Sequence, residues 1–142
     1  MEHHLTTYIT HDTLISALGF GTQENLEAIR SYHSGITLQT DKRIADTPLL
    51  AATLSQDRLQ QQAEAIGVSG YPRMEQLFIL TINELIRQSG QTLEDKTCGL
   101  ILSTTKGNID LLARHTEHPD EAVFLWKMAE NIAGYFHAEE RM

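Results

Sequence analysis

Residues 71–90 read YPRMEQLFILTINELIRQSG, the most regular pattern in this chain of 142 residues. Apolar or small side chains recur there at spacings of three and four, at Met74, Leu77, Phe78, Thr81, Ile82, Leu85 and Ile86. This repeat predicts an amphipathic helix whose apolar side faces a core. Pro72 suits the first turn of such a helix, and Gly90 suits the position just after its last turn.

The sequence downstream of this helix predicts a buried strand followed by further helices. Residues 98–103 read CGLILS, a short apolar run bounded by polar residues, which is typical of a strand buried on both faces in an α/β sheet. Residues 104–108 form the loop that leaves this strand, residues 109–115 read as helical, and a last helix opens at Pro119 and Asp120. We expect the apolar side of that last helix to hold Ala122, Trp126, Ala129, Ile132, Ala133 and Phe136.

The sequence upstream of residue 71 is less regular. Part of 5–15 is expected to be a strand, and the glycines in 17–21 indicate a turn after it. A helix is expected from about Gln23 to Tyr32. Residues 36–55 read as a long loop with at most one short strand or helical turn, and 56–66 as a short surface helix. Alternation of strands and helices favours a layered α/β domain.

Composition and charge limit the function classes that the chain fits. A length of 142 residues fits one domain. The net charge of −8 disfavours binding to nucleic acids and to anionic membrane surfaces, and no apolar run is long enough to span a membrane. Cys98 is the only cysteine, so an internal disulfide is excluded, and a reducing, cytoplasmic location is expected.

Three groups of residues bear chemistry, and each has a plainer explanation. Cys98 begins an apolar strand, which favours a structural thiol over a nucleophile. His115, Glu117 and His118 lack a further ligand at motif spacing, so a solvated helix end explains them better than a metal site. Residues 104–108 lie where α/β sheets place ligands but lack the phosphate-loop glycine pattern, so a nucleotide-binding domain is a weaker alternative. No metal and no cofactor are expected.

The order of several short motifs adds a second line of argument. Residues 14–21 read LISALGFG and lead into a helix that closes with SGI at 34–36. The 73–90 helix, the 98–108 strand and loop, and ENIAGYF at 130–136 follow. In this order the segments resemble the opening of β-ketoacyl-[acyl-carrier-protein] synthases, thiolase-like enzymes in which the first strand ends in a Ser-x-Leu-Gly-x-Gly turn.

The resemblance implies an α/β fold, the N-terminal half of a thiolase-like fold, in which a mixed sheet with packed helices is left incomplete and 98–103 is an interior strand. Residues 1–142 would form the N-terminal synthase domain, cut short before the family's reactive cysteine. The family catalyses decarboxylative Claisen condensation of an acyl thioester with malonyl carrier protein, in fatty acid or polyketide-like synthesis. Covalent catalysis needs the nucleophile and its activating groups together, so this chain alone is expected to be inactive.

The resemblance also implies a set of pocket residues and partners. The residues expected at the acyl tunnel or the dimer contact are Thr105, Lys106, Gly107, Phe124, Leu125 and Met128. For Lys106, a solvated loop lysine is an equally good explanation. The implied partners are an acyl carrier protein, through the full-length enzyme, and a second subunit. The alternative function is a non-catalytic scaffold module that associates with itself through uncovered apolar surface.

Overall fold

The computed structural model describes residues 6–114 and 120–138. This part of the chain contains four α-helices, α1 (Thr22–Arg30), α2 (Gln56–Ala65), α3 (Arg73–Ser89) and α4 (Leu125–Tyr135). It contains two antiparallel strand pairs, β1 (Ile15–Ser16) with β2 (Gly19–Phe20) and β3 (Ile36–Gln39) with β4 (Leu49–Ala52). Two 3-10 helices, η1 (Ile109–Arg114) and η2 (Glu121–Val123), precede α4. The chain therefore combines helices and strands, as the sequence predicts.

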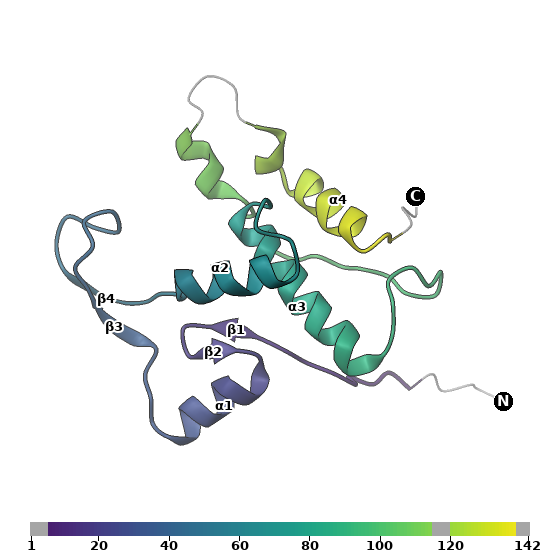
Figure 1. Cartoon of the computed structure of the whole chain (residues 1–142), viewed down its shortest axis with the longest axis horizontal. Coiled ribbons are helices and arrows are strands. Elements are labelled where there is room, and N and C mark those ends of the chain that lie inside the picture. Colours follow the sequence, from purple (N-terminus) through teal and green to yellow (C-terminus); the bar gives the residue numbers. More distant parts are fainter. Residues whose placement is uncertain (1–5, 115–119, 139–142) are drawn as a thin grey trace.

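Helix α3 is the centre of the structure, with α2 and α4 packed against it (Figure 1). Its bounds confirm the prediction, because Pro72 precedes its first residue and Gly90 ends it in a left-handed conformation. The predicted surface helix at 56–66 is confirmed as α2, whose Leu59 and Ala63 are fully buried. Helix α2 begins after a capping residue: the Ser55 hydroxyl accepts a hydrogen bond from the Arg58 amide.

The hydrophobic core is small and lies where α2, α3 and α4 meet. Its buried members are Ala63, Val68, Ile79, Met128, Ile132 and Phe136. Four side chains of the predicted α3 stripe, Met74, Phe78, Ile82 and Ile86, pack around this cluster. The prediction that Trp126 belongs to the core is wrong, since 58% of it is exposed. Phe124 is extended between η2 and α4, and the α4 residues buried in the core are Met128 and Ile132.

Residues 98–103 do not form the strand predicted for them. The segment has no regular secondary structure and no strand partner among the described residues. Leu100 and Leu102 pack against the core, whereas Ile101 between them is 93% exposed. This alternation is that of an extended chain covered on one face only, not on both. The predicted mixed sheet is therefore wrong for the described part of the chain, which contains only antiparallel pairs.

The strand predicted within 5–15 is reduced to the two residues of β1, at 15–16. It forms a hairpin with β2 through the predicted turn, and α1 follows directly. A Cβ atom on Gly19 would stand 2.5 Å from the Cβ of Glu24, so the hairpin approaches α1 too closely for any other residue at that position. Leu26 and Ile29 of α1 are exposed, and the buried residue of this helix is Asn25.

Asn25 holds the hairpin to α1. Its side-chain amide donates to the carbonyl oxygens of Gly19 at 3.0 Å and Gly21 at 2.8 Å, and its oxygen accepts from the Ser16 hydroxyl. Removing a side chain with such partners leaves buried polar groups unpaired. We expect Asn25→Ala to lower the free energy of unfolding by about 1–3 kcal/mol.

Urea denaturation measures this change, with Gln23→Ala on the exposed side of the same helix as the control. Gln23 makes one exposed hydrogen bond, to Glu27, and its replacement is expected to change stability by less than about 0.5 kcal/mol. Equal effects of the two substitutions would contradict the role of Asn25.

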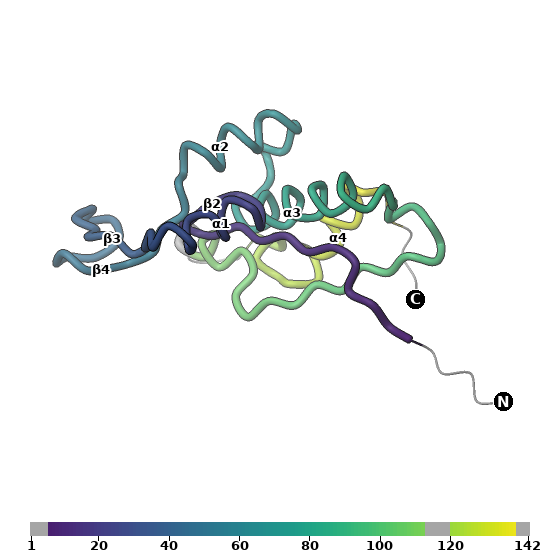
Figure 2. Tube along the Cα trace, turned by 90° about the horizontal axis from the view of Figure 1, so that it is seen from below, coloured from purple at the N-terminus to yellow at the C-terminus, as the bar shows by residue number. Residues whose placement is uncertain are grey.

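The segment 36–55, expected to be mostly loop, contains the hairpin β3–β4. This ribbon projects from the helical body in both views (Figures 1 and 2). Its apolar side chains Ile36, Leu38 and Leu50 are exposed. The strands pair with each other alone in the described part, so neither face of the ribbon is covered by a second layer.

Candidate functional site

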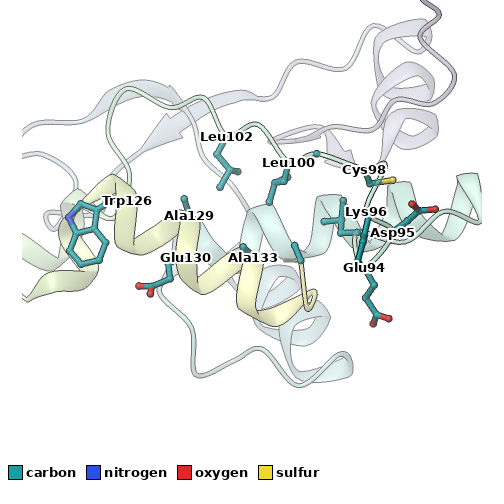
Figure 3. Close-up of a pocket in the computed structure, with 13 residues that line it drawn as sticks. Glu94, Asp95, Lys96, Cys98, Leu100, Leu102, Trp126, Ala129, Glu130 and Ala133 are labelled. Atoms are coloured by element: carbon teal, nitrogen blue, oxygen red, sulfur yellow. The ribbon is translucent and has the colours of Figure 1, made fainter. Parts of the chain in front are cut away.

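A cavity of about 520 Å³ lies between α4 and the segment 93–102. Leu93, Leu100 and Leu102 line it from the segment, and Trp126, Ala129 and Ala133 line it from α4 (Figure 3). Charged side chains, among them Glu94 and Glu130, stand at its rim. The groove is thus apolar in its floor and acidic at its edge, which suits an apolar ligand or a covering segment of protein.

Cys98 lies in this groove and is half-buried. The prediction that it begins a buried strand is wrong. The described residues that line the groove include the cation Lys96 but no histidine base. The cysteine–histidine arrangement of many catalytic thiols is therefore not formed among these lining residues.

The loop 104–108 and the start of α4 come into contact. A Cβ atom on Gly107 would stand 2.5 Å from Cδ2 of Leu125 and 3.9 Å from Sδ of Met128. Gly107 also has a φ of +58°, a left-handed conformation that favours glycine. The structure therefore brings Gly107, Leu125 and Met128 together, with Met128 buried beneath the other two.

The other three residues expected at the site are exposed. The side chains of Thr105 and Lys106 face solvent. Phe124 is 45% exposed and stacks on Trp126, with ring centroids 6.3 Å apart and planes 12° apart. Together with the half-exposed Leu125, these two rings form an apolar surface at the N-terminal end of α4.

A buried polar cluster lies behind the loop and was not expected. Glu75 of α3 is fully buried, and its Oε1 accepts from the Asn108 side-chain amide at 2.8 Å and from the Asn131 amide at 3.2 Å. Burial raises the pKa of the Glu75 carboxyl above its ordinary 4.5, while the two amide hydrogen bonds and the charge of Lys127 act in the opposite direction.

The helical pattern carried a signal for this cluster. Glu75 lies at spacings of four, seven and eleven residues from Ile79, Ile82 and Ile86, so it shares the inward face of α3 with them. An acidic residue on such a face indicates a buried partner. The partners themselves come from the 104–108 loop and from α4, and their approach depends on the tertiary fold.

The alternatives for ligand binding find little support in the described residues. The loop 104–108 leads into a 3-10 helix of six residues, and Asn108 points to Glu75 rather than to an open site. His115, Glu117 and His118 lie outside the described residues. Within 6–114 and 120–138, no group of three or more His, Cys, Asp or Glu side chains could hold a metal ion. No described helix is long and apolar enough to cross a membrane.

Comparison with known proteins gives no relative for this chain. No protein-family model, curated protein sequence or solved structure matches it significantly.

Proposed function

We propose that the chain is the N-terminal part of a condensing enzyme of the β-ketoacyl-[acyl-carrier-protein] synthase type. In this role it supplies one wall of the acyl pocket and not the reactive thiol. The proposal is carried by one observation, the contact of Gly107 with Leu125 and Met128. The two segments that the resemblance assigns to the acyl tunnel or the dimer contact are thus neighbours, and a Cβ on the loop glycine would overlap the Leu125 side chain.

The exposed apolar surface gives further support. Ile101, Leu125 and Trp126 are exposed, and Trp126 also lines the groove between the 93–102 segment and α4. In the proposed enzyme, the remainder of the protein covers this side and supplies the strands that pair with 98–103. The proposed enzyme therefore does not require residues 98–103 to be an interior strand in this chain alone.

The reaction requires groups from outside the described residues. In the family, a cysteine sulfur attacks the acyl thioester, and the carrier thiol leaves. Loss of CO2 from the malonyl group then gives the carbanion that attacks the enzyme-bound thioester and releases the cysteine. Cys98 has no histidine in its groove, so we assign it no part in these steps. We propose an acyl carrier protein and a second subunit as partners, and a cytoplasmic location.

The proposal is tested on the complete protein encoded by the gene. Its reading frame is expected to continue into an Ala-Cys turn soon after Met142. The purified protein is expected to release CO2 from malonyl carrier protein and to extend an acyl thioester. Replacing the cysteine of that turn by alanine is expected to abolish extension, whereas Cys98→Ser leaves the rate within about twofold.

Two outcomes would overturn the proposal. A reading frame without such a turn would remove the nucleophile that the reaction needs. Loss of extension in the Cys98→Ser variant, with its fold intact by circular dichroism, would assign the reactive thiol to this chain instead.

We propose a self-associating scaffold as the second candidate. The observation in its favour is the projecting β3–β4 ribbon, whose Ile36, Leu38 and Leu50 are exposed. Large uncovered apolar patches favour association between proteins. Light scattering after size exclusion tests it on the 142-residue chain: a mass that rises with concentration supports association, and a monomer at all concentrations rejects it.

A further inference from the structure

Glu75 joins three segments that are distant in the sequence. It lies in α3, it accepts a hydrogen bond from Asn108 of the loop at 2.8 Å, and it accepts from Asn131 of α4 at 3.2 and 3.3 Å. The second N–H of the Asn108 amide donates to the carbonyl oxygen of Ala122 in η2, at 2.8 Å. Glu75 and Asn108 are both fully buried. We propose that Glu75 is a positioning residue that fixes the separation between the 104–108 loop and α4.

The chemistry of the cluster suits this role. Both asparagines present N–H donors, and a side-chain oxygen on α3 accepts from the two at once. A carboxyl group therefore fits the site, whereas an apolar side chain of the same size would leave an N–H of each asparagine without its acceptor. Unpaired buried donors are costly, so the loop and α4 keep their positions as long as Glu75 is present.

The cluster also contains an unpaired acceptor. The side-chain oxygen of Asn108 is buried and has no hydrogen-bond partner in the described part of the chain. Buried polar atoms without partners are rare in native structures, because each costs stability.

The polar cluster lies next to the proposed pocket border. Gly107 is adjacent to Asn108 in the loop, and Met128 lies one turn before Asn131 in α4. Holding the two asparagines therefore holds the contact of Gly107 with Leu125 and Met128. Resting on the proposed function, we further infer that Glu75 sets the width of the acyl pocket and so the acyl length that the enzyme accepts.

The first test uses hydrogen exchange in the 142-residue chain. Glu75→Leu removes the acceptor at nearly constant size, and the amides of Leu111, Val123 and Phe124 are expected to exchange about tenfold faster or more. These amides bond to Asn108, Asp120 and Glu121 around the cluster. The amides of Ser31 in the α1 region and Leu59 in α2 are expected to be unchanged.

Two further variants make this test specific. Glu75→Gln keeps an acceptor oxygen and is expected to restore wild-type exchange within about twofold. Glu84→Leu makes the same chemical change on the outer side of α3, where Glu84 pairs with Arg87. This variant is expected to leave the exchange of the Leu111, Val123 and Phe124 amides unchanged. Uniform acceleration over the whole chain, or equal exchange in the Leu and Gln variants, would overturn the positioning role.

A pH series gives a readout that does not require the Leu variant to fold. Lys127 is the charged group near Glu75 that stabilises its carboxylate. Lys127 also forms an ion pair with Glu130 and interacts electrostatically with Glu121. Burial raises the pKa of Glu75 in the folded state. The contribution of this shift to the free energy of unfolding is therefore complete below about pH 4.5, and it declines as the pH rises through the folded-state pKa. Glu75→Gln is neutral at all pH values.

The urea midpoint of Glu75→Gln relative to wild type is therefore expected to rise with pH above 4.5 and then to level off. A relative midpoint that is constant with pH would contradict a buried carboxyl at this site. Both readouts concern this chain alone, so they stand whatever the activity of the complete protein.

The second test uses the complete protein and its acyl-length profile. Glu75→Leu is expected to change the ratio of kcat/KM for long and short acyl thioesters by about tenfold, with Glu75→Gln close to wild type. If the protein extends no acyl group at all, the proposed function fails and the exchange result remains. If it extends them with an unchanged length profile, the pocket-width inference fails alone.

Discussion

Ile79→Ala is expected to lower the free energy of unfolding by about 2–5 kcal/mol, and Ile101→Ala by less than about 0.5 kcal/mol. Ile79 is fully buried in the core between α2, α3 and α4, whereas Ile101 is 93% exposed. Truncating the first leaves a cavity among packed side chains, and truncating the second removes contacts with water only. Urea denaturation of the 142-residue chain measures both.

The comparison distinguishes two descriptions of residues 98–103. A strand buried on both faces would make Ile101→Ala as costly as Ile79→Ala. A cost near zero agrees with a segment covered on one side. In the proposed complete enzyme, Ile101 becomes covered, so the same substitution is then expected to cost several-fold more than it does in this chain.

Gly107→Ala is the second substitution with a large expected effect, a loss of about 1.5–3.5 kcal/mol in the free energy of unfolding. Alanine at a φ of +58° is strained by about 1–2 kcal/mol, and its Cβ would overlap Cδ2 of Leu125, the far end of a half-exposed side chain whose displacement from its rotamer costs about 0.5–1.5 kcal/mol. The Leu125 side chain must turn away from the loop. Thermal and urea unfolding measure the loss.

Two other glycines separate the contributions. Gly67 has a φ of +75° with no atom within 4 Å of an added Cβ, so Gly67→Ala reports the backbone strain alone, about 1–2 kcal/mol. Gly99 has open space and no positive φ, and Gly99→Ala is expected to be nearly neutral. If Gly107→Ala costs no more than Gly67→Ala, Leu125 turns away freely, and its contact does not fix the pocket border proposed from it.

Helices α2 and α3 were predictable because their signals are local. Their apolar side chains recur with the helical period, and Pro72, Gly67 and Gly90 mark boundaries through backbone conformation alone. These properties depend on neighbours within a few residues, so the sequence contains them directly.

The conformation of residues 98–103 was not predictable in the same way. An apolar run predicts that a segment is buried, but it does not indicate whether one face or both faces are buried, or which segments pack against it. Strand pairing depends on segments far along the chain, and here the described residues offer none. The prediction for Trp126 is wrong for a related reason. Apolar side chains lie on two faces of α4, and the sequence does not show that the face with Met128 meets the core while Trp126 lines the groove.

The candidate site was predictable only in part. The resemblance named Gly107, Leu125 and Met128, and the structure places them in contact. It gave no role to Glu75, whose burial depends on amides 33 and 56 residues away. The sequence shows a charged residue on an apolar helix face, which indicates a buried partner, but the identity of that partner depends on the tertiary fold.

The groove beside α4 has a practical consequence for following assembly. Its wall carries the only thiol of the chain, half-buried beside Leu100. A maleimide fluorophore would therefore attach at a single position, on the surface where other protein is proposed to lie. Its emission would shift when that surface loses water, so a chain with one cysteine carries its own reporter of docking.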